Sequence, residues 1–498
     1  MKILVLNPPF LPRYSRASRS PAVTRSGTLY YPMWLAYAVG HLEQCGHTIL
    51  FLDAPANDYS PAEIARRAAE FGAELAVLDT STPSIQNDCT VGEFLQAQIP
   101  GLFVVLVGVH VSALPQETLL SCKTIQAVAF GEYDHTVADL AALLLKPDGL
   151  SRLGEVAGLC FRSTNNTIIQ NRARELITDL DSLPMVSSVY RRHLNIQHYF
   201  YGHSKFPLMV LVSGRGCPFK CTYCVLPQTM MGHAYRKRSI AGVVAEFQYI
   251  AANFPDVKEI MFEDDTFTAD KNRCREFAQA LIAAKATTIP WSANSRADVD
   301  YETMRLLRKA NCRLFCVGFE SGDQTILDAI CKSITLDKIQ QFRRDARKAG
   351  ILIHGCFMVG NRGETPATLE KTLKHALALN PDTAQFYPIM VYPGTSDYRY
   401  FGEKGWITTT DFRQWLTPEG LHSSVVSNPA LPYEVLVEFC DRARRTFFLR
   451  PAYIIQKMFQ MVRHPSEARR LIKAALPFLW YQFKKPARKD SATACRTC

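Results

Sequence analysis

The regular alternation of short apolar segments with amphipathic helical segments constrains this chain more than any other feature. Within residues 1–150, five apolar segments have the length and composition of buried strands, and helical patterns lie between them. Such an alternation is typical of a parallel sheet with helices on both faces. We therefore predict an α/β fold that begins with a doubly wound, Rossmann-like domain. The predicted strands are KILVLNPP (2–9), HTILFLDAP (47–55), AELAVLDTST (73–82), FVVLVGVH (103–110) and AVAFGEYD (127–134).

A second alternation of the same kind starts near Phe206 and runs to about residue 400. It contains six strand-like segments, each followed by a helical pattern, among them LMVLVSGRG (208–216) and ILIHGCFMVG (351–360). Six such steps predict a partial (β/α)6 barrel, whose active site lies at the carboxyl ends of its strands. A polar linker with a small hairpin precedes this barrel, and a helical, basic region follows it. The expected divisions are 1–150, 151–205, 206–400 and 401–498.

The composition is that of a folded protein without signs of secretion or membrane insertion. Apolar residues make up 47% of the chain and charged residues 21%, and no apolar run approaches the roughly 18–20 residues that span a bilayer. The start, MKILVLNPPF, lacks the longer apolar region and the cleavage site of a signal peptide. Fifteen cysteines without a secretory signal favour reduced thiols, with metal binding where they cluster. We expect a cytoplasmic protein.

Four of the predicted strand segments in the first domain end in short turns. Doubly wound sheets bind ligands at the carboxyl ends of their strands, so these turns are the candidate ligand contacts of this domain. The motif GxGxxG is absent, which disfavours a dinucleotide. The candidate contacts are Asn7, Pro8, Ser81, Thr82, Gly108, Val109, His110, Gly131 and Glu132.

The stretch VSGRGCPFKCTYCVLP (212–227) places Cys217, Cys221 and Cys224 at the spacing C-x3-C-x2-C. Four cysteines would close a zinc or iron–sulfur site, whereas three leave one metal position unfilled by protein. The alternatives are a zinc site completed by a distant histidine and a chance grouping in a cysteine-rich chain. The position of the triplet, directly after a strand at the mouth of the predicted barrel, favours an iron–sulfur cluster.

The segment CPFKCTYC resembles the CxxxCxΦC signature of the radical S-adenosylmethionine (SAM) superfamily, with Tyr223 at the aromatic position. The resemblance implies that the three cysteines hold a [4Fe-4S] cluster, whose fourth iron binds the amino and carboxylate groups of SAM. It also implies that an electron from the cluster cleaves SAM to a 5′-deoxyadenosyl radical, which abstracts hydrogen from a substrate. An external electron donor such as a flavodoxin or ferredoxin is then required.

Later strand ends resemble the other SAM contacts of this superfamily. FEDDTFT (262–268) stands where the family carries a Gly-Gly-Glu type motif, but it departs from that sequence and leaves the contact to the SAM amino group open among three acids. VGFESG (317–322) resembles the ribose and carboxylate contacts, and GCFMVGNRGET (355–365) resembles the stretch beside the adenine. YPGT (392–395) resembles a motif of the last strand. The implied SAM contacts are Glu263, Asp264, Asp265, Glu320, Ser321 and the backbone from Met358 to Gly360.

The first domain resembles the cobalamin-binding branch of the superfamily through NPPF, YYPMWLAYAVGHLEQCGH, STPS, GVHVSALPQETL and VAFGEYDHTVADL. This resemblance implies that the candidate contacts of that domain bind cobalamin. The motif DxHxxG, which supplies a lower axial histidine to cobalt in many cobalamin domains, is absent. His110 follows the fourth strand, but a loop histidine more often forms hydrogen bonds than binds cobalt. The alternative is a vestigial sheet that binds no cofactor.

Together the resemblances imply a cobalamin-dependent radical SAM enzyme that methylates an unactivated carbon. Relatives of this architecture include the anaerobic magnesium-protoporphyrin ester cyclase, so a cyclase or ring-rearranging enzyme without net methyl transfer is the first alternative. A non-catalytic cluster-binding protein is the second. Cys312, Cys316, Cys331 and Cys356 lie near barrel strands and are candidate hydrogen donors, although packing as small apolar residues is the simpler interpretation.

The net charge of +11 is concentrated toward the C-terminus. About a dozen basic residues lie between Arg442 and Lys489, against the single acid Glu467, and aromatic residues are interspersed among them. Helices of this composition bind anionic lipid, so peripheral membrane contact and a lipid-linked substrate form one hypothesis beside an ordinary small-molecule substrate. A helix packed on the barrel with a solvated basic face is the simpler one. No recognised nucleic-acid module is present, and we expect no nucleic-acid partner.

Overall fold

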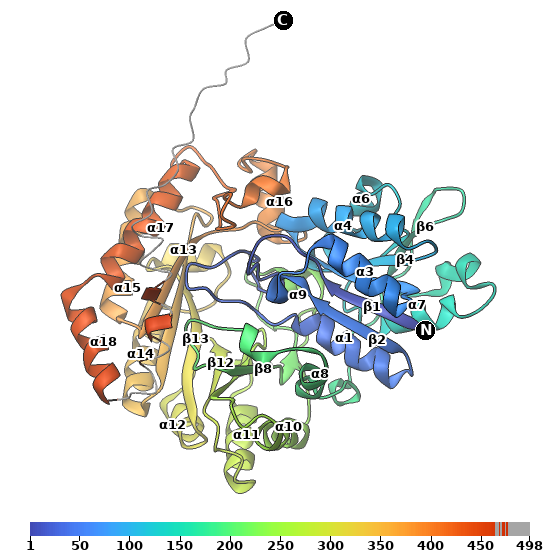
Figure 1. The fold of residues 1–498 in the computed structure, drawn as a ribbon. Coiled ribbons are helices and arrows are strands. Elements are labelled where there is room, and N and C mark those ends of the chain that lie inside the picture. The colour runs from blue at the N-terminus through green and yellow to red at the C-terminus, as the bar shows by residue number, and fades with distance from the viewer. Residues whose placement is uncertain (464–467, 469–470, 474, 477–498) are drawn as a thin grey trace, which may run out of the picture.

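A computed structural model of the chain describes residues 1–463, 468, 471–473 and 475–476. It contains two large sheets that lie side by side, one formed by the N-terminal third and one by the middle of the chain (Figure 1). Both sheets have the alternation of strands and helices that the sequence predicts. Among the described residues, no helix combines the length and the apolar character needed to cross a membrane.

The first sheet has the strand order β2-β1-β3-β4-β5-β6-β7, and its first five strands are parallel. The order 2-1-3-4-5 is one of the two common doubly wound arrangements, and ligands bind outside the carboxyl ends of its strands. The predicted hairpin is present, and its two antiparallel strands extend this sheet at the β5 edge. The strands are β1 (Lys2–Asn7), β2 (Thr48–Asp53), β3 (Leu75–Thr80), β4 (Phe103–Gly108), β5 (Ala127–Ala129), β6 (Leu159–Arg162) and β7 (Ile168–Gln170).

Helices cover both faces of this sheet because successive residues of each buried strand point to opposite sides. Ile3 and Val5 of β1 belong to the core that contains α1 and α7, whereas Leu4 and Leu6 belong to the core beneath α3 and α4. Ser60 caps α3 by accepting a hydrogen bond from the amide of Glu63 at 3.2 Å. The helices are α1 (Met33–Gln44), α2 (Ala54–Asn57), α3 (Pro61–Phe71), η1 (Thr82–Ser84), α4 (Ile85–Gln98), α5 (Val109–Ala113), α6 (Pro115–Ser121), α7 (Asp134–Leu144) and η2 (Gly149–Glu155).

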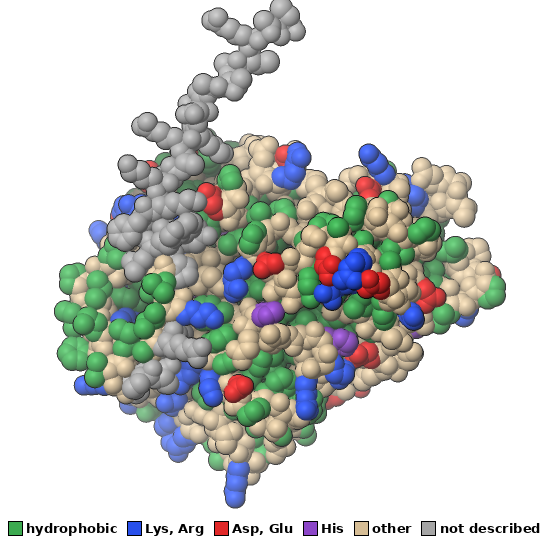
Figure 2. Space-filling model, viewed as in Figure 1, with side chains coloured by type: hydrophobic (Ala, Val, Ile, Leu, Met, Phe, Trp, Pro, Cys, Tyr) green, Lys and Arg blue, Asp and Glu red, His purple; other side chains and the backbone are tan. Residues whose placement is uncertain are grey.

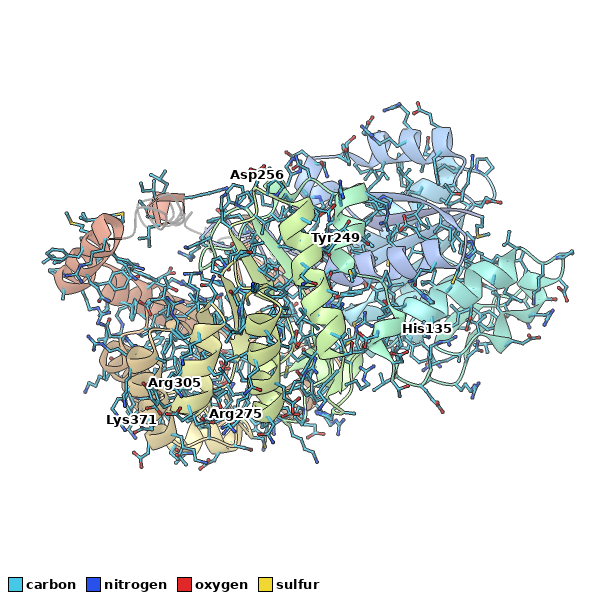
Figure 3. All side chains as sticks on the ribbon, turned by 90° about the horizontal axis from the view of Figure 1, so that it is seen from below. His135, Tyr249, Asp256, Arg275, Arg305 and Lys371 are labelled. Carbon is cyan, nitrogen blue, oxygen red and sulfur yellow. The ribbon has the colours of Figure 1, made fainter. Side chains whose placement is uncertain are left out.

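The second sheet is an open barrel of six parallel strands in the order β15-β14-β13-β12-β11-β8. Its helices lie outside the strands, and a view from below shows Tyr249, Arg275 and Arg305 on three of them (Figure 3). The strands are β8 (Leu208–Leu211), β11 (Glu259–Phe262), β12 (Trp291–Ser295), β13 (Cys312–Glu320), β14 (Leu352–Val359) and β15 (Thr383–Pro388). The helices are α10 (Ile240–Asn253), η5 (Phe267–Ala269), α11 (Lys271–Ala283), α12 (Tyr301–Lys309), α13 (Gln324–Ala329), α14 (Leu336–Ala349) and α15 (Pro366–Leu379).

The cysteine segment forms a separate small unit at the carboxyl end of β8. The predicted strand LMVLVSGRG is interrupted after Leu211, and its last part forms a second, short strand that pairs antiparallel with residues beyond the cysteines. Between the hairpin and the barrel, the linker contains η3 (Leu180–Ser182), α8 (Val186–His193) and η4 (Ile196–His198). The cysteine unit contains β9 (Gly214–Arg215), α9 (Val225–Thr229) and β10 (Arg236–Lys237).

The C-terminal region is helical, as the sequence predicts. Helical patterns in LPYEVLVEFCDRARRTFF (431–448) and YIIQKMFQMV (453–462) correspond to two helices of the structure, and the pattern in SEARRLIKAALPFLWYQFKK (466–485) falls mainly outside the described residues. Helix α17 packs on the last barrel strand, where the ring centroids of Phe386 and Phe447 lie 6.2 Å apart. The elements of this region are α16 (Ser396–Glu403), η6 (Phe412–Trp415), α17 (Tyr433–Phe448) and α18 (Pro451–Arg463).

Candidate active site

The loop that carries the three cysteines is held in shape by backbone and side-chain hydrogen bonds. The amide of Gln228 donates to the carbonyl oxygens of Cys221, Thr222 and Cys224 at 3.3, 3.1 and 2.8 Å. Gly216 has a φ of +84°, and a side chain there would begin 2.2 Å from a carbonyl oxygen, so only glycine fits. These contacts restrict the backbone of the loop around the three cysteines.

The three cysteines are free thiols that face a common space. Burial raises the pKa of Cys224 well above its usual value, and Asp265, Cys221 and Cys217 raise it further. Their sulfur atoms do not all lie within 4.8 Å of one another, nor do they meet a fourth such ligand within the described part of the chain.

The three consecutive acids at the end of β11 have different surroundings. Asp264 accepts hydrogen bonds from the amide and hydroxyl of Ser213 at 2.7 and 2.6 Å, so it holds the backbone that enters the cysteine loop. Asp265 has a buried carboxylate oxygen without a hydrogen-bond partner, and burial raises its pKa. It lies near enough to Cys224 to raise the pKa of that thiol. Among the three, Asp265 thus has the unused acceptor beside the thiols.

Glu263, the first of these acids, is paired with a residue of the first domain. Its carboxylate accepts hydrogen bonds from Arg19 at 2.9 Å and from the amide of Asn294 at 3.0 Å. Arg19 also donates to the carbonyl oxygen of Asp264 at 2.7 Å. Burial alone would lower the pKa of Arg19, but Glu263 and Asp265 raise it above its usual value. The segment after β1 therefore reaches the barrel strand ends through one charged contact.

Glu320 ends β13 inside a small polar network. Its Oε1 accepts hydrogen bonds from the hydroxyl of Tyr223 and from the ammonium of Lys332, both at 2.8 Å. Its Oε2 is buried without a partner, and its φ of +63° is rare for a residue other than glycine. Ser321 points elsewhere, to the hydroxyl of Thr372 at 3.2 Å. The structure thus places Glu320, but not the side chain of Ser321, beside the cysteine loop.

The turn after β14 is closed by an acid that follows it. The carboxylate of Glu364 accepts hydrogen bonds from the amides of Gly360 and Asn361, the latter at 2.9 Å. Gly360 has a φ of +92°, which only glycine adopts without strain. The backbone carbonyl of Met358 accepts a hydrogen bond from the side chain of Asn361 at 2.8 Å. This turn presents backbone at the carboxyl edge of the barrel.

These observations fit a [4Fe-4S] cluster and SAM. Three thiols are available for iron, and three buried carboxylate oxygens, on Asp265, Glu320 and Glu364, have no partner within the described structure. Glu364 closes the turn after β14 through its other oxygen, whereas Asp265 and Glu320 lie beside the cysteine loop. A buried acceptor without a donor is costly, and the amino and hydroxyl groups of SAM are donors. We therefore assign the cluster to the three cysteines as a proposal. We likewise propose that Asp265, Glu263, Glu320 and the Met358–Gly360 backbone contact SAM.

At the carboxyl edge of the first sheet, several predicted contacts are engaged with other residues of the chain. Asn7 contacts Asp53 at 2.7 Å and also Arg16, and Pro8 accepts a hydrogen bond from Arg16 at 2.9 Å. The hydroxyl of Ser81 lies 2.8 Å from that of Tyr14. Asn7, Pro8 and Ser81 are buried, so the segment after β1 covers this part of the edge.

His110 is buried and oriented by its neighbours. Its Nδ1 lies 3.2 Å from the hydroxyl of Thr82, and the ring meets Phe412 of the C-terminal region edge to face at 5.1 Å. Burial lowers the pKa of His110 to about 3, so the ring is neutral. Val109 and His110 belong to the first turn of α5, so the prediction of a loop there was wrong. The turn forms because Gly108, with a φ of +107°, lets the chain enter a helix directly after β4.

The open part of this edge lies at the ends of β4 and β5. Val109 and Gly131 are partly exposed, and a side chain at position 131 would meet no atom within 4 Å. Glu132 is different, because both of its oxygens are bound, to Arg215 at 2.8 Å and to Arg236 at 2.7 Å. Gly131 thus borders open space at this edge, whereas Glu132 links the first domain to the cysteine loop.

The two carboxyl edges meet in the folded chain. Helix α5, which follows β4, packs against α9, which follows the cysteine loop. A side chain added at Gly394 would come within 3.0 Å of Ala113 in α5, so these two residues are neighbours. The hydroxyl of Ser20 lies 3.1 Å from the hydroxyl of Tyr392 and 2.8 Å from Nε2 of His422. The candidate contacts of both domains thus border one region.

Several residues that shape this region were not predicted from the sequence. They are Arg19, Gln228, Asn294 and Lys332, which lie in no recognised motif. Gln228 and Lys332 contact residues 4 to 12 positions away, whereas the partners of Arg19 and Asn294 are distant in sequence. Arg19 and Glu263, for example, are 244 positions apart. Only Lys332 had a local signal, since a lone lysine near strand ends is a common partner for a buried acid.

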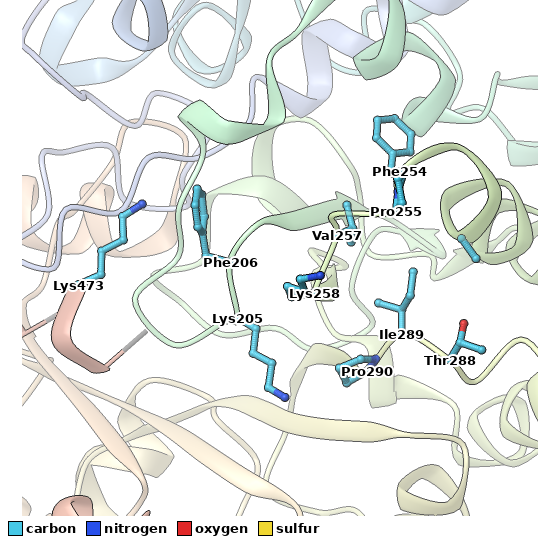
Figure 4. Close-up of a pocket in the computed structure, with 11 residues that line it drawn as sticks. Lys205, Phe206, Phe254, Pro255, Val257, Lys258, Thr288, Ile289, Pro290 and Lys473 are labelled. Carbon is cyan, nitrogen blue, oxygen red and sulfur yellow. The ribbon is translucent and has the colours of Figure 1, made fainter. Parts of the chain in front are cut away.

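A separate cavity of about 460 Å³ lies at the opposite end of the barrel (Figure 4). Its lining includes Phe206, Lys258 and Ile289, which precede β8, β11 and β12 at their amino ends. Active sites of such barrels lie at the carboxyl ends, so this cavity does not belong to the candidate site.

Two protein-family models match the chain. The radical SAM superfamily matches residues 211–376, and the B12 binding domain matches residues 19–141. A protein of Pyrococcus horikoshii named an uncharacterized methyltransferase is 28% identical over 97% of this chain and 99% of its own length. The anaerobic magnesium-protoporphyrin IX monomethyl ester cyclase of Rubrivivax gelatinosus is 25% identical over 85% of this chain and 74% of its own.

Solved structures resemble the fold over most of this chain. The radical SAM methyltransferase TsrM of Kitasatospora setae, with cobalamin and a [4Fe-4S] cluster bound, superposes with a TM-score of 0.68. The superposition covers 91% of this chain and 89% of TsrM at 16% sequence identity. It supports the order of the two sheets and the C-terminal region as one fold.

Proposed function

This chain is a radical SAM enzyme with an N-terminal B12-binding domain, and we propose that it transfers a methyl group to an unactivated carbon of a small-molecule substrate. The observation that carries the proposal is the packing of α5 on α9, which brings the open edge at Val109 and Gly131 beside the cysteine loop. A methyl group and a substrate radical must meet, and this arrangement gives both cofactors access to one region. The relative from Pyrococcus horikoshii, which bears the name methyltransferase, also aligns along nearly the whole chain.

In this proposal the cofactors supply the difficult chemistry and the chain orients them. When bound, the [4Fe-4S] cluster supplies the electron that cleaves SAM, and cobalamin carries the methyl group. Gln228 fixes the backbone of the cysteine loop, and Asp265 and Glu320 accept hydrogen bonds from SAM through their unpartnered oxygens. Tyr223 and Lys332 hold the carboxylate of Glu320 in place. Arg19 reaches Glu263 from the segment after β1, and Phe412 of η6 packs on His110, so both segments border this region.

A cyclase without net methyl transfer is the second candidate, favoured by the likeness to the Rubrivivax gelatinosus enzyme. The two outcomes differ in their products. Protein with cluster and cobalamin reconstituted anaerobically would be incubated with SAM and a strong reductant, and 5′-deoxyadenosine and S-adenosylhomocysteine would be quantified. Both products support methyl transfer, whereas deoxyadenosine alone supports the cyclase. Neither product, from protein with both cofactors present by spectroscopy, would overturn the assignment of radical chemistry. Cys221→Ala serves as the control that lacks the cluster.

We further propose that a flavodoxin or ferredoxin reduces the cluster.

We also propose that α18 contacts an anionic lipid surface. One face of α18 carries four apolar side chains that are 52–78% exposed, namely Ile455, Met458, Phe459 and Val462. Figure 2 shows hydrophobic side chains gathered over this helix. An exposed apolar helical face beside basic residues is typical of interfacial binding, and it would bring a lipid-linked substrate to the enzyme.

Flotation with vesicles of phosphatidylglycerol or of phosphatidylcholine tests this contact. Replacing both Phe459 and Val462 by serine is preferable to truncation, because α17 packs on the barrel and its loss would expose the core. The wild-type chain should float with anionic vesicles and the double variant should not. The exposed Leu120 of α6 offers a matched control as Leu120→Ser. Equal flotation of wild type and double variant would exclude the contact.

A further inference from the structure

Two cysteines and a histidine lie together on the inner face of the barrel. Phe315 and Phe319 of β13 contact Phe342 of helix α14, so the residues that alternate with them point inward. Cys316 therefore faces the barrel interior. On β14 the same alternation places His354 and Cys356 inward, in line with Met358, because Phe357 lies against Phe386.

The ligand atoms of these three residues are close enough to share one metal ion. The sulfur atoms of Cys316 and Cys356 are 4.0 Å apart, and these two sulfurs and one ring nitrogen of His354 all lie within 4.8 Å of one another. Tetrahedral zinc, with bonds of about 2.3 Å to sulfur and 2.0–2.1 Å to nitrogen, separates its donors by roughly 3.6–3.8 Å. Side-chain rotations that bring these ligand atoms about 1 Å closer together would complete that geometry.

The surroundings of the group support a ligand role for it. The Nδ1 of His354 lies 2.7 Å from the hydroxyl of Thr383, and His203 stacks on the ring at 4.7 Å, so two neighbours set its orientation. Ring nitrogens of metal-binding histidines are oriented by such partners. Unlike fully buried Cys312 on the same strand, Cys316 and Cys356 are partly exposed. Partial exposure inside a barrel gives an ion a path to the site.

We propose that Cys316, His354 and Cys356 bind a divalent thiophilic ion such as zinc through two thiolates and one imidazole. Binding forms two metal–sulfur bonds and one metal–nitrogen bond, and the two thiol protons pass to solvent. Three protein ligands leave one position of a tetrahedral ion for water or another donor. Cys356 precedes the proposed SAM contact Met358 by two residues, so the ion would lie one side-chain layer below SAM.

Zinc content of the full-length chain tests the site independently of catalysis. Anaerobically purified protein with an intact cluster would be dialysed against zinc, and bound zinc would be counted by mass spectrometry. We expect one zinc ion per chain. Replacing all of Cys217, Cys221 and Cys224 by alanine should leave that zinc in place, which separates the site from the cluster loop.

Single substitutions identify the ligands. Cys316→Ala and Cys356→Ala should weaken zinc binding by roughly 100-fold or more, and Thr383→Val, which removes only the orienting partner, by about 10-fold. Cys312→Ala on the same strand is the matched control and should bind zinc as the wild type does. Equal zinc binding by Cys316→Ala and wild type would overturn the proposal.

X-ray absorption of wild-type protein loaded with zinc keeps the test decisive if a variant does not fold. The expected spectrum has two sulfur neighbours at about 2.3 Å and one or two nitrogen or oxygen neighbours. An absence of bound zinc, or a first shell without sulfur, would reject the site. Neither result depends on SAM cleavage, so failure of the site and failure of the proposed function are distinguishable.

Discussion

At the scale of single residues, Glu320 and Ser321 are neighbours with different expected roles. Glu320 has a free oxygen near the cysteine loop, whereas Ser321 is bonded to Thr372. We predict that Glu320→Gln weakens SAM binding roughly 10- to 100-fold, because a hydrogen bond to a charged group contributes about 1.5–3 kcal/mol. Equilibrium dialysis of SAM with cluster-loaded protein measures this change.

Ser321→Ala is the control for that experiment and should change SAM affinity less than about twofold. Burial alone would lower the pKa of Lys332, but Glu320 raises it, so Glu320→Gln also removes the partner of a buried cation. Thermal unfolding therefore has to be recorded for both variants. A folded Glu320→Gln protein with unchanged SAM affinity would show that Glu320 is not a SAM contact.

His110 gives a second prediction at this scale. The ring is neutral, faces Thr82 and Phe412, and lies inside the first domain. We predict that His110→Phe leaves the absorption spectrum of bound cobalamin unchanged, together with its electron paramagnetic resonance in the cobalt(II) state. Nitrogen hyperfine splitting that is present in the wild type and lost in His110→Phe would contradict this and identify His110 as an axial ligand.

At the scale of elements, the turn after β14 depends on the buried carboxyl of Glu364. Burial raises its pKa to about 7, compared with about 4.3 in an unfolded chain. The folded state then binds more protons than the unfolded state, so its stability falls as pH rises from about 4 to about 7. We predict that Glu364→Gln, which cannot ionise, gains up to roughly 3 kcal/mol relative to wild type over that interval.

Urea unfolding of both proteins between about pH 4 and pH 8 measures the difference. Glu370 on the following helix α15 provides a control of opposite sign, because hydrogen bonding from Arg442 lowers its pKa. That pair is exposed, so Glu370→Gln should lose a small amount of stability as pH rises, well under 1 kcal/mol. A pH-independent difference for Glu364→Gln would refute the role of burial.

At the scale of the whole molecule, Arg215 joins the first domain to the cysteine loop. Its buried guanidinium contacts Glu132 at 2.8 Å and Asp134 at 2.7 Å. It also lies over the rings of Trp34 and Tyr37. Removing one member of a buried ion pair leaves uncompensated charge, which costs about 3–5 kcal/mol. We predict that Arg215→Ala lowers the unfolding midpoint and increases hydrogen exchange in both the cysteine loop and the start of α7.

The exposed pair of Lys237 and Asp270, 3.0 Å apart, supplies the comparison for Arg215. Lys237→Ala should cost less than about 1 kcal/mol, since solvent screens such pairs. Arg215→Lys keeps the charge but not the forked geometry, and should fall between the two. If Arg215→Ala raised exchange only within its own strand, the two units would be joined mainly by apolar packing.

Much of the molecule was predictable because its signals are local. Strands buried on both faces produce continuous apolar runs, and the runs in residues 1–150 gave five parallel strands at the predicted places. The cysteine triplet lies within eight residues, so its spacing, together with its position after a predicted strand, indicated an iron–sulfur site. The proposed SAM contacts were harder to predict, because FEDDTFT contains three adjacent acids whose differences arise from residues distant in sequence, such as Ser213 and Arg19.

By itself, the sequence determined the order of the two α/β units, the cysteine loop and the absence of a DxHxxG histidine. Only the tertiary structure decided that Ser213 binds Asp264 and that Asp265 keeps an unpartnered oxygen. It also decided that Glu132 is bound by arginines and is not available to a ligand. It also brought Cys316 of β13 beside Cys356 of β14, although 40 residues separate them. The physical reason is the same throughout. Strand formation depends on local periodicity, whereas ligand geometry depends on side chains that meet only when parallel strands align.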